Sequence, residues 1–148
     1  MAVTDEQVAA LRAQLQGKSD EHLRWLDHLE RTGETDGYVA LVTGAFFEAV
    51  DRRFIKEGHV ADESEIVEFI AATRAAHPNV ADDLDPSVAE PVLLHALGKG
   101  SVEGIDGAKV FKTQILLMGA LVGDADLDED ELEAFLAKAR AEADAHLG

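Results

Sequence analysis

The chain of 148 residues contains no cysteine, three prolines and no long hydrophobic run. Without cysteine it can form no disulfide, no thiolate nucleophile and no Cys-ligated zinc site, which is typical of a cytoplasmic protein. The longest uncharged run near a helix core spans the eleven residues 113–123, well short of the ~20 needed to cross a bilayer. The N-terminus lacks the basic and apolar regions of a signal peptide. We therefore expect a cytoplasmic protein with no transmembrane segment.

Basic side chains are also scarce. There are 13 Lys and Arg against 30 Asp and Glu, a net charge of −17. Such a chain is repelled by nucleic-acid phosphates and by anionic membranes, so nucleic-acid binding is not expected. Cations or a basic protein are its natural electrostatic partners. Apolar residues make up 47% of the chain, which favours a folded protein despite the charge.

Helix signals dominate and no convincing strand appears. Capping residues precede most apolar stripes, as in the capping box Thr4–Gln7. We expect an all-α, single-domain bundle of about seven helices over residues 1–148. Its parts are an N-terminal hairpin (4–32), a first repeat unit (36–77), a connecting helix (85–100) and a second repeat unit (106–147).

Two expectations concern packing within this bundle. The N-terminal hairpin should turn its leucines inward: Leu11, Leu15, Leu23, Leu26 and Leu29. Because it has no counterpart in the repeats, it is also the part most free to mediate dimerisation. Gly119 and Gly123, on one face of a later helix, should let a neighbouring helix approach closely.

The repeats rest on an internal similarity. Residues 62–76 (DESEIVEFIAATRAA) and 128–142 (DEDELEAFLAKARAE) agree at 7 of 15 aligned positions. The informative matches are the acidic start, Phe69 with Phe135, and Arg74 with Arg140. A duplicated segment predicts two copies of one supersecondary unit. Both phenylalanines should therefore be buried at corresponding positions.

The sharpest chemical feature is the acidic run GDADLDEDELE, residues 123–133, with seven carboxylates in the ten positions from Asp124. Alternating acids at the start resemble half of a calcium loop. However, Glu129 stands where that loop needs Gly and Phe135 where it needs a bidentate Glu. A looser Ca²⁺ or Mg²⁺ site remains an option, as does a plain acidic helix N-terminus. The metal ligands we predict are Asp124, Asp126, Asp128 and Glu131, with Glu57 and Asp62 as a weaker first copy.

The same residues resemble the tellurite-resistance TerB-like domains. In that family two helices are joined by an Asp, a small residue, any residue, an apolar residue, three further residues and a Glu. Here the pattern is Asp124-Ala125-Asp126-Leu127 followed by Glu131, and in the first copy Glu57-Gly58-His59-Val60 followed by Glu65. Ala125 replaces the usual Gly, Glu57 replaces the usual Asp, and Glu65 comes one residue later than the pattern has it. The resemblance implies a duplicated all-helical domain with a cation site at these loops.

For catalysis the sequence offers little. It contains neither G-x-S-x-G, nor H-E-x-x-H, nor a P-loop. His59, in the first acidic loop, could join a cation site or simply be solvated. We therefore expect a non-enzymatic domain that acts through a protein partner or as a homodimer in a stress response, with or without a divalent cation. The alternative is an acidic protein-binding module, like an immunity protein or antitoxin, with no metal.

Overall fold

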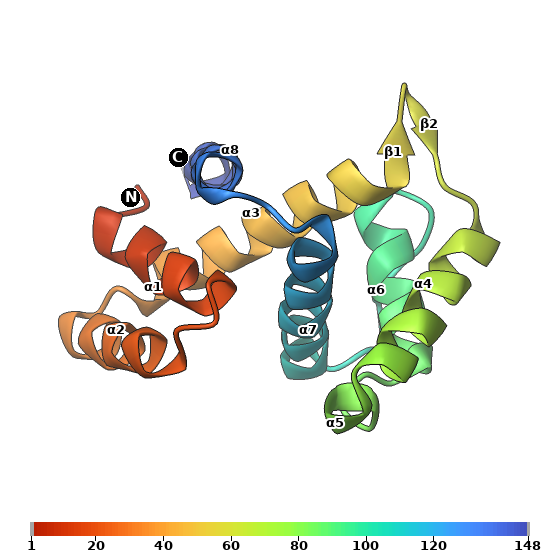
Figure 1. Cartoon of the computed structure of the whole chain (residues 1–148), viewed down its shortest axis with the longest axis horizontal. Coiled ribbons are helices and arrows are strands. Elements are labelled where there is room, and N and C mark those ends of the chain that lie inside the picture. Colours follow the sequence, from red (N-terminus) through yellow and green to blue (C-terminus); the bar gives the residue numbers. More distant parts are fainter. Residues whose placement is uncertain (1, 148) are drawn as a thin grey trace. The chain divides into compact units, whose positions relative to one another are not determined.

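The computed structural model describes residues 2–147, so the two terminal residues of the predicted domain lie outside it. Within this range it has eight helices and one short hairpin of strands (Figure 1). The fold is all-α, as predicted. The elements are α1 (Asp5–Leu15), α2 (Ser19–Thr32), α3 (Thr35–Phe54), β1 (Ile55–Lys56), β2 (His59–Val60), α4 (Glu63–Ala76), α5 (Pro78–Ala81), α6 (Pro86–Ala96), α7 (Gly107–Ala125) and α8 (Glu129–Leu147). No helix in the described range is both long and apolar enough to cross a membrane.

The chain divides into two compact units. The first contains residues 1–48 and 122–148, and the second contains residues 49–121. In the first unit α1 packs against α2 and α8, and in the second α4 packs against α5 and α6. Each predicted repeat, 36–77 and 106–147, contributes residues to both units. The repeats are therefore not the compact units, and the duplication itself stays a prediction.

Polar side chains cap the N-termini of α1, α4 and α6. The Thr4 hydroxyl accepts from the Gln7 backbone N–H, and the Gln7 side chain in turn accepts from Thr4 N–H at 2.8 Å. Asp62 caps α4, and Asp85 caps α6 with Pro86 in its first turn. Each cap satisfies N–H groups that have no partner inside the helix. The capping residues therefore fix where these helices start.

The expectation of no strand was wrong between α3 and α4. There, Ile55 pairs with Val60 and Lys56 with His59 in an antiparallel hairpin. The two loop residues, Glu57 and Gly58, have φ of 53° and 79°. Two positive φ values are the signature of a type I′ turn, whose twist matches that of the flanking strands. Strands of two residues are too short to show an alternating pattern, so the sequence showed no sign of this hairpin.

The leucines of the N-terminal hairpin do not all point inward. Leu11 and Leu29 are buried, whereas Leu15 and Leu26 are half-buried. Leu23 is 61% exposed, so the prediction was wrong for this residue. At 3.6 residues per turn, Leu23 lies about 120° around the helix from Leu29. Only the side of α2 centred on Leu29 can therefore be covered by the rest of the unit.

Phe69 and Phe135 are both buried, as predicted, at 5% and 1% exposure. In the second unit, the Phe69 ring meets Phe54 edge-to-face, with 5.4 Å between centroids. The matched arginines both donate to backbone carbonyls: Arg74 to Ala81 at 3.1 Å and Arg140 to Val3 at 2.7 Å. These are similar roles for aligned residues within different units.

Close helix approach occurs at a different glycine from those expected. No atom lies within 4 Å of a Cβ built on Gly119 or Gly123. In the first unit, by contrast, a Cβ on Gly44 would lie 2.9 Å from the Ala139 carbonyl oxygen of α8. The absence of a side chain at Gly44 is what lets α3 and α8 pack closely.

Candidate functional site

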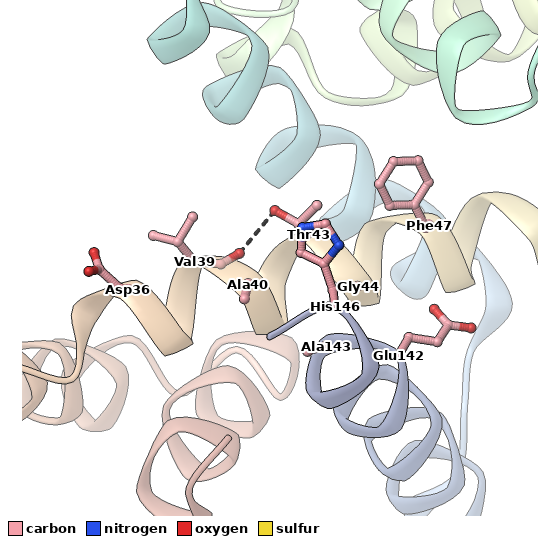
Figure 2. Close-up of a pocket in the computed structure, with 9 residues that line it drawn as sticks. All are labelled: Asp36, Val39, Ala40, Thr43, Gly44, Phe47, Glu142, Ala143 and His146. Carbon is pink, nitrogen blue, oxygen red and sulfur yellow. Dashed lines mark hydrogen bonds between the residues drawn. The ribbon is translucent and has the colours of Figure 1, made fainter. Parts of the chain in front are cut away.

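A groove lies between α3 and α8 within the first unit (Figure 2). Its volume is ≈ 460 Å³, within the range of about 300–1,000 Å³ that is usual for ligand sites. Apolar side chains and the bare backbone of Gly44 supply most of its surface. The lining residues are Asp36, Val39, Ala40, Thr43, Gly44, Phe47, Glu142, Ala143 and His146.

The spacing of these residues explains the shape of the groove. On α3 they recur at alternating intervals of three and one, which places them along one side of the helix. Ala40, Gly44 and Ala143 are small and leave space between the two helices, while Val39 and Phe47 stand as larger side chains along α3 (Figure 2). The Thr43 hydroxyl donates to the Val39 carbonyl at 2.9 Å, so this polar group is satisfied inside its own helix. The groove therefore presents a mainly apolar surface.

The ionisable side chains that line the groove are two carboxylates and one histidine. Asp36 comes from the start of α3, and Glu142 and His146 lie one turn apart on α8. No Lys or Arg is among the lining residues. Lys138, one turn before Glu142, lies 3.6 Å from the buried Glu48 carboxylate. An apolar groove with two carboxylates suits an apolar group carried next to positive charge.

Sequence reasoning did not find this groove. The uncharged run 38–47 is typical of a central helix, but Val39 is 38% exposed and Phe47 is half-buried. The only signal was the pair of small residues Ala40 and Gly44, four apart on one side of the helix. Their partners on α8 lie about 100 residues further along the chain, so periodicity within α3 could not identify them.

The acidic run 123–133 borders a second hollow of ≈ 520 Å³ in the first unit. Of the four predicted ligands, Asp126 and Asp128 line it, together with Glu129, whereas Asp124 and Glu131 do not. Lys18 also lines this hollow. The structure therefore places a basic side chain beside the carboxylates that we expected to hold a cation.

Two of the predicted ligands are used in capping α8. The Asp128 carboxylate accepts from Glu131 N–H at 2.8 Å, and the Glu131 carboxylate accepts from Asp128 N–H at 3.0 Å. This reciprocal arrangement is a capping box. Asp126 has φ of 48°, the left-handed conformation that Asp tolerates better than most residues. Asp128 and Glu131 therefore stabilise the start of α8 whether or not a metal ion is bound.

Another carboxylate of the run is neutralised by a distant arginine. Arg12 of α1 donates two hydrogen bonds, both 2.7 Å long, to Glu133. These bonds lower the pKa of Glu133 and raise that of Arg12. With Lys18 nearby, the chain's own cations relieve part of the repulsion within the acidic run.

The two ligands predicted in the first copy, Glu57 and Asp62, also have structural positions of their own. Glu57 occupies the exposed hairpin turn, and Asp62 caps α4. Asp62 accepts from the Ser64 hydroxyl at 2.7 Å and from Glu65 N–H at 3.1 Å, and these bonds lower its pKa. Within residues 2–147, no three His, Asp or Glu side chains are grouped so that they could hold a metal ion. The cation site remains a prediction from the sequence.

Comparisons of this chain with protein-family models, with curated proteins and with solved structures found no match. The resemblance to TerB-like domains therefore stays a prediction from the sequence.

Proposed function

We propose that this chain is a non-enzymatic protein-interaction domain that binds a basic segment of a partner protein in the groove between α3 and α8. The observation that carries the proposal is the groove itself: an apolar surface whose charged lining residues are Asp36 and Glu142, with no Lys or Arg. The matching ligand is a segment with an apolar anchor and flanking Lys or Arg residues.

Two further observations support this class of partner. The net charge of −17 would attract a basic segment over long range and accelerate its association. The part of α3 from Val39 to Phe47, which carries the apolar lining residues, is about 12 Å long at 1.5 Å per residue. That length matches two turns of a bound helix, which could place two or three apolar side chains along it.

Binding of a designed peptide provides the test. The probe is a fluorescent basic helical peptide with leucines at positions i, i+3 and i+7, compared with the same peptide carrying Glu in place of Lys. Val39→Arg, at 38% exposure, adds a bulky positive charge inside the groove. Val67→Arg makes the same change at 45% exposure on α4, outside the groove. We expect Val39→Arg to weaken binding about tenfold or more, equivalent to ~1.4 kcal/mol.

The control variant distinguishes binding in the groove from general electrostatic attraction to an acidic protein. Val67→Arg should change the dissociation constant only slightly, and the acidic peptide should not bind. Anisotropy titrations at two NaCl concentrations would measure both effects, since long-range attraction weakens with salt. An equal loss of peptide affinity in the two Arg variants would show that binding depends on the net charge of the protein and does not occur in the groove.

Divalent-cation binding at the acidic run is the second candidate, favoured by the hollow that Asp126, Asp128 and Glu129 line. At a free cation concentration of about 100 times the dissociation constant, binding would raise the free energy of unfolding by about 2.7 kcal/mol. Millimolar Ca²⁺ or Mg²⁺ should then raise the melting temperature. Asp124→Asn combined with Asp126→Asn should abolish the rise while leaving the α8 cap intact. An equal rise in NaCl of matched ionic strength would exclude this site.

A further inference from the structure

The outer side of α2 carries an exposed leucine beside a hollow. Leu23 is 61% exposed, the highest value among the large exposed apolar side chains of the described residues. Leu26, one turn further along, is half-buried at the edge of a hollow of ≈ 260 Å³. That hollow is lined by Leu26, Leu29, Glu30, Thr35 and Tyr38. A protruding side chain and an apolar hollow thus lie within two turns of each other.

We propose that this side of α2 is a homodimer interface, independent of the partner groove. In a two-fold dimer the same surface meets itself, so a protrusion and a hollow on one surface can fill each other twice. Leu23 of each copy would enter the other copy's hollow, against Leu29 and Tyr38. Leu26 lies midway between Leu23 and Leu29 on α2, so the two-fold axis would pass close to it.

The charges on α2 favour a second copy over a basic partner. Between Ser19 and Thr32 there are four acidic and two basic residues, and Lys18 precedes them. One of the acids, Asp27, is already paired with Arg31 at 2.8 Å. Helix α2 together with Lys18 is therefore far closer to electrical balance than the chain as a whole, and Glu30 is the one charged residue that lines the hollow. This side of α2 can face itself without the strong local repulsion that an acidic surface would meet.

A hydrogen bond holds the Tyr38 side of the hollow. The Tyr38 hydroxyl donates to the Gln14 amide oxygen at 3.2 Å, and Tyr38 is 7% exposed. One helix face buries less than the ~1,200 Å² of a standard stable interface. The dimer should therefore be weak and reversible. Since each copy carries a charge of −17, it should tighten as NaCl screens the long-range repulsion.

Sedimentation velocity across a range of protein concentrations, up to about 0.5 mM, tests the interface. The wild-type chain should shift from monomer to dimer, more so in higher NaCl. Leu23→Asn should remain monomeric, whereas Val67→Asn, a polar change at another exposed position, should dimerise like the wild type. A wild type that stays monomeric throughout, or an equal effect of both variants, would overturn the proposal.

Cross-linking locates the axis, and the absence of native cysteine makes it unambiguous. Leu26→Cys should form a disulfide-linked dimer under mild oxidation, since residues near the axis can approach within the ~7 Å Cα separation that a disulfide needs. Val67→Cys should not. Equal cross-linking of the two variants would contradict an interface at α2. Leu23→Asn should still bind the basic peptide in the groove, so the two proposals can fail separately.

Discussion

Replacing Phe135 with alanine should lower the free energy of unfolding by about 3–5 kcal/mol, the usual cost of deleting a buried aromatic ring. Phe135 is 1% exposed on α8 and among the largest fully buried side chains of the described chain. The loss combines the apolar surface returned to water with the cavity left behind. Since whole domains are stable by only about 5–15 kcal/mol, the first unit should be close to unfolding.

Two further variants serve as comparisons for Phe135→Ala. Phe69→Ala, at 5% exposure in the second unit, should cost a similar amount, as the aligned sequences predict. Val67→Ala, two residues away but 45% exposed, should change stability by less than about 0.5 kcal/mol. Urea denaturation monitored by circular dichroism would measure all three. A loss below about 1 kcal/mol for Phe135→Ala would contradict its place in the core.

Two Gly→Ala substitutions on helices should have effects of opposite sign. At Gly44 the new methyl would lie 2.9 Å from the Ala139 carbonyl oxygen, so the α8 backbone would have to move. Forcing atoms into a packed contact typically costs about 1–3 kcal/mol. At Gly119 nothing lies within 4 Å, and the residue is exposed inside α7. There alanine should stabilise the helix by about 0.5–1 kcal/mol, through the backbone entropy that glycine loses on folding.

The same pair of variants bears on the groove. Gly44→Ala should also weaken binding of the basic peptide, because the methyl narrows the space between α3 and α8. Gly119→Ala should leave binding unchanged. Melting temperatures and peptide titrations of both variants would measure these effects. Stabilisation by Gly44→Ala would show that α3 and α8 do not approach each other as closely as described.

The sequence could predict elements whose signals are local. The N-caps Thr4, Asp62 and Asp128 act within three residues of themselves, so they mark helix starts without knowledge of the fold. The burial of Phe69 and Phe135 followed from matching two segments of the same chain. The β1–β2 hairpin was missed because its signal is only a Glu-Gly turn between two-residue strands. The exposure of Leu23 was missed because periodicity shows which side of a helix is apolar but not how much of it is covered.

For the candidate sites, too, local features could be predicted from the sequence, whereas contacts between distant residues could not. The acidic run could be found from its density of carboxylates, but its positive neighbours, Arg12 and Lys18, lie more than 100 residues earlier in the chain. Arg12 binds Glu133, and Lys18 lines the hollow beside Asp126 and Asp128, so basic side chains of the same chain lie next to the acidic run. The groove depends on which part of α8 faces Gly44. Only the folded structure determines that contact.

The basic-segment proposal is tested most directly by mapping peptide binding with nuclear magnetic resonance. A ¹⁵N-labelled chain would be titrated with the basic leucine-containing peptide, and amide shifts would be followed residue by residue. We expect the largest shifts at Val39, Ala40, Thr43, Phe47 and Ala143, with saturation at a single dissociation constant. Shifts concentrated at residues 124–133, or small shifts spread evenly over the acidic surface, would contradict binding in the groove.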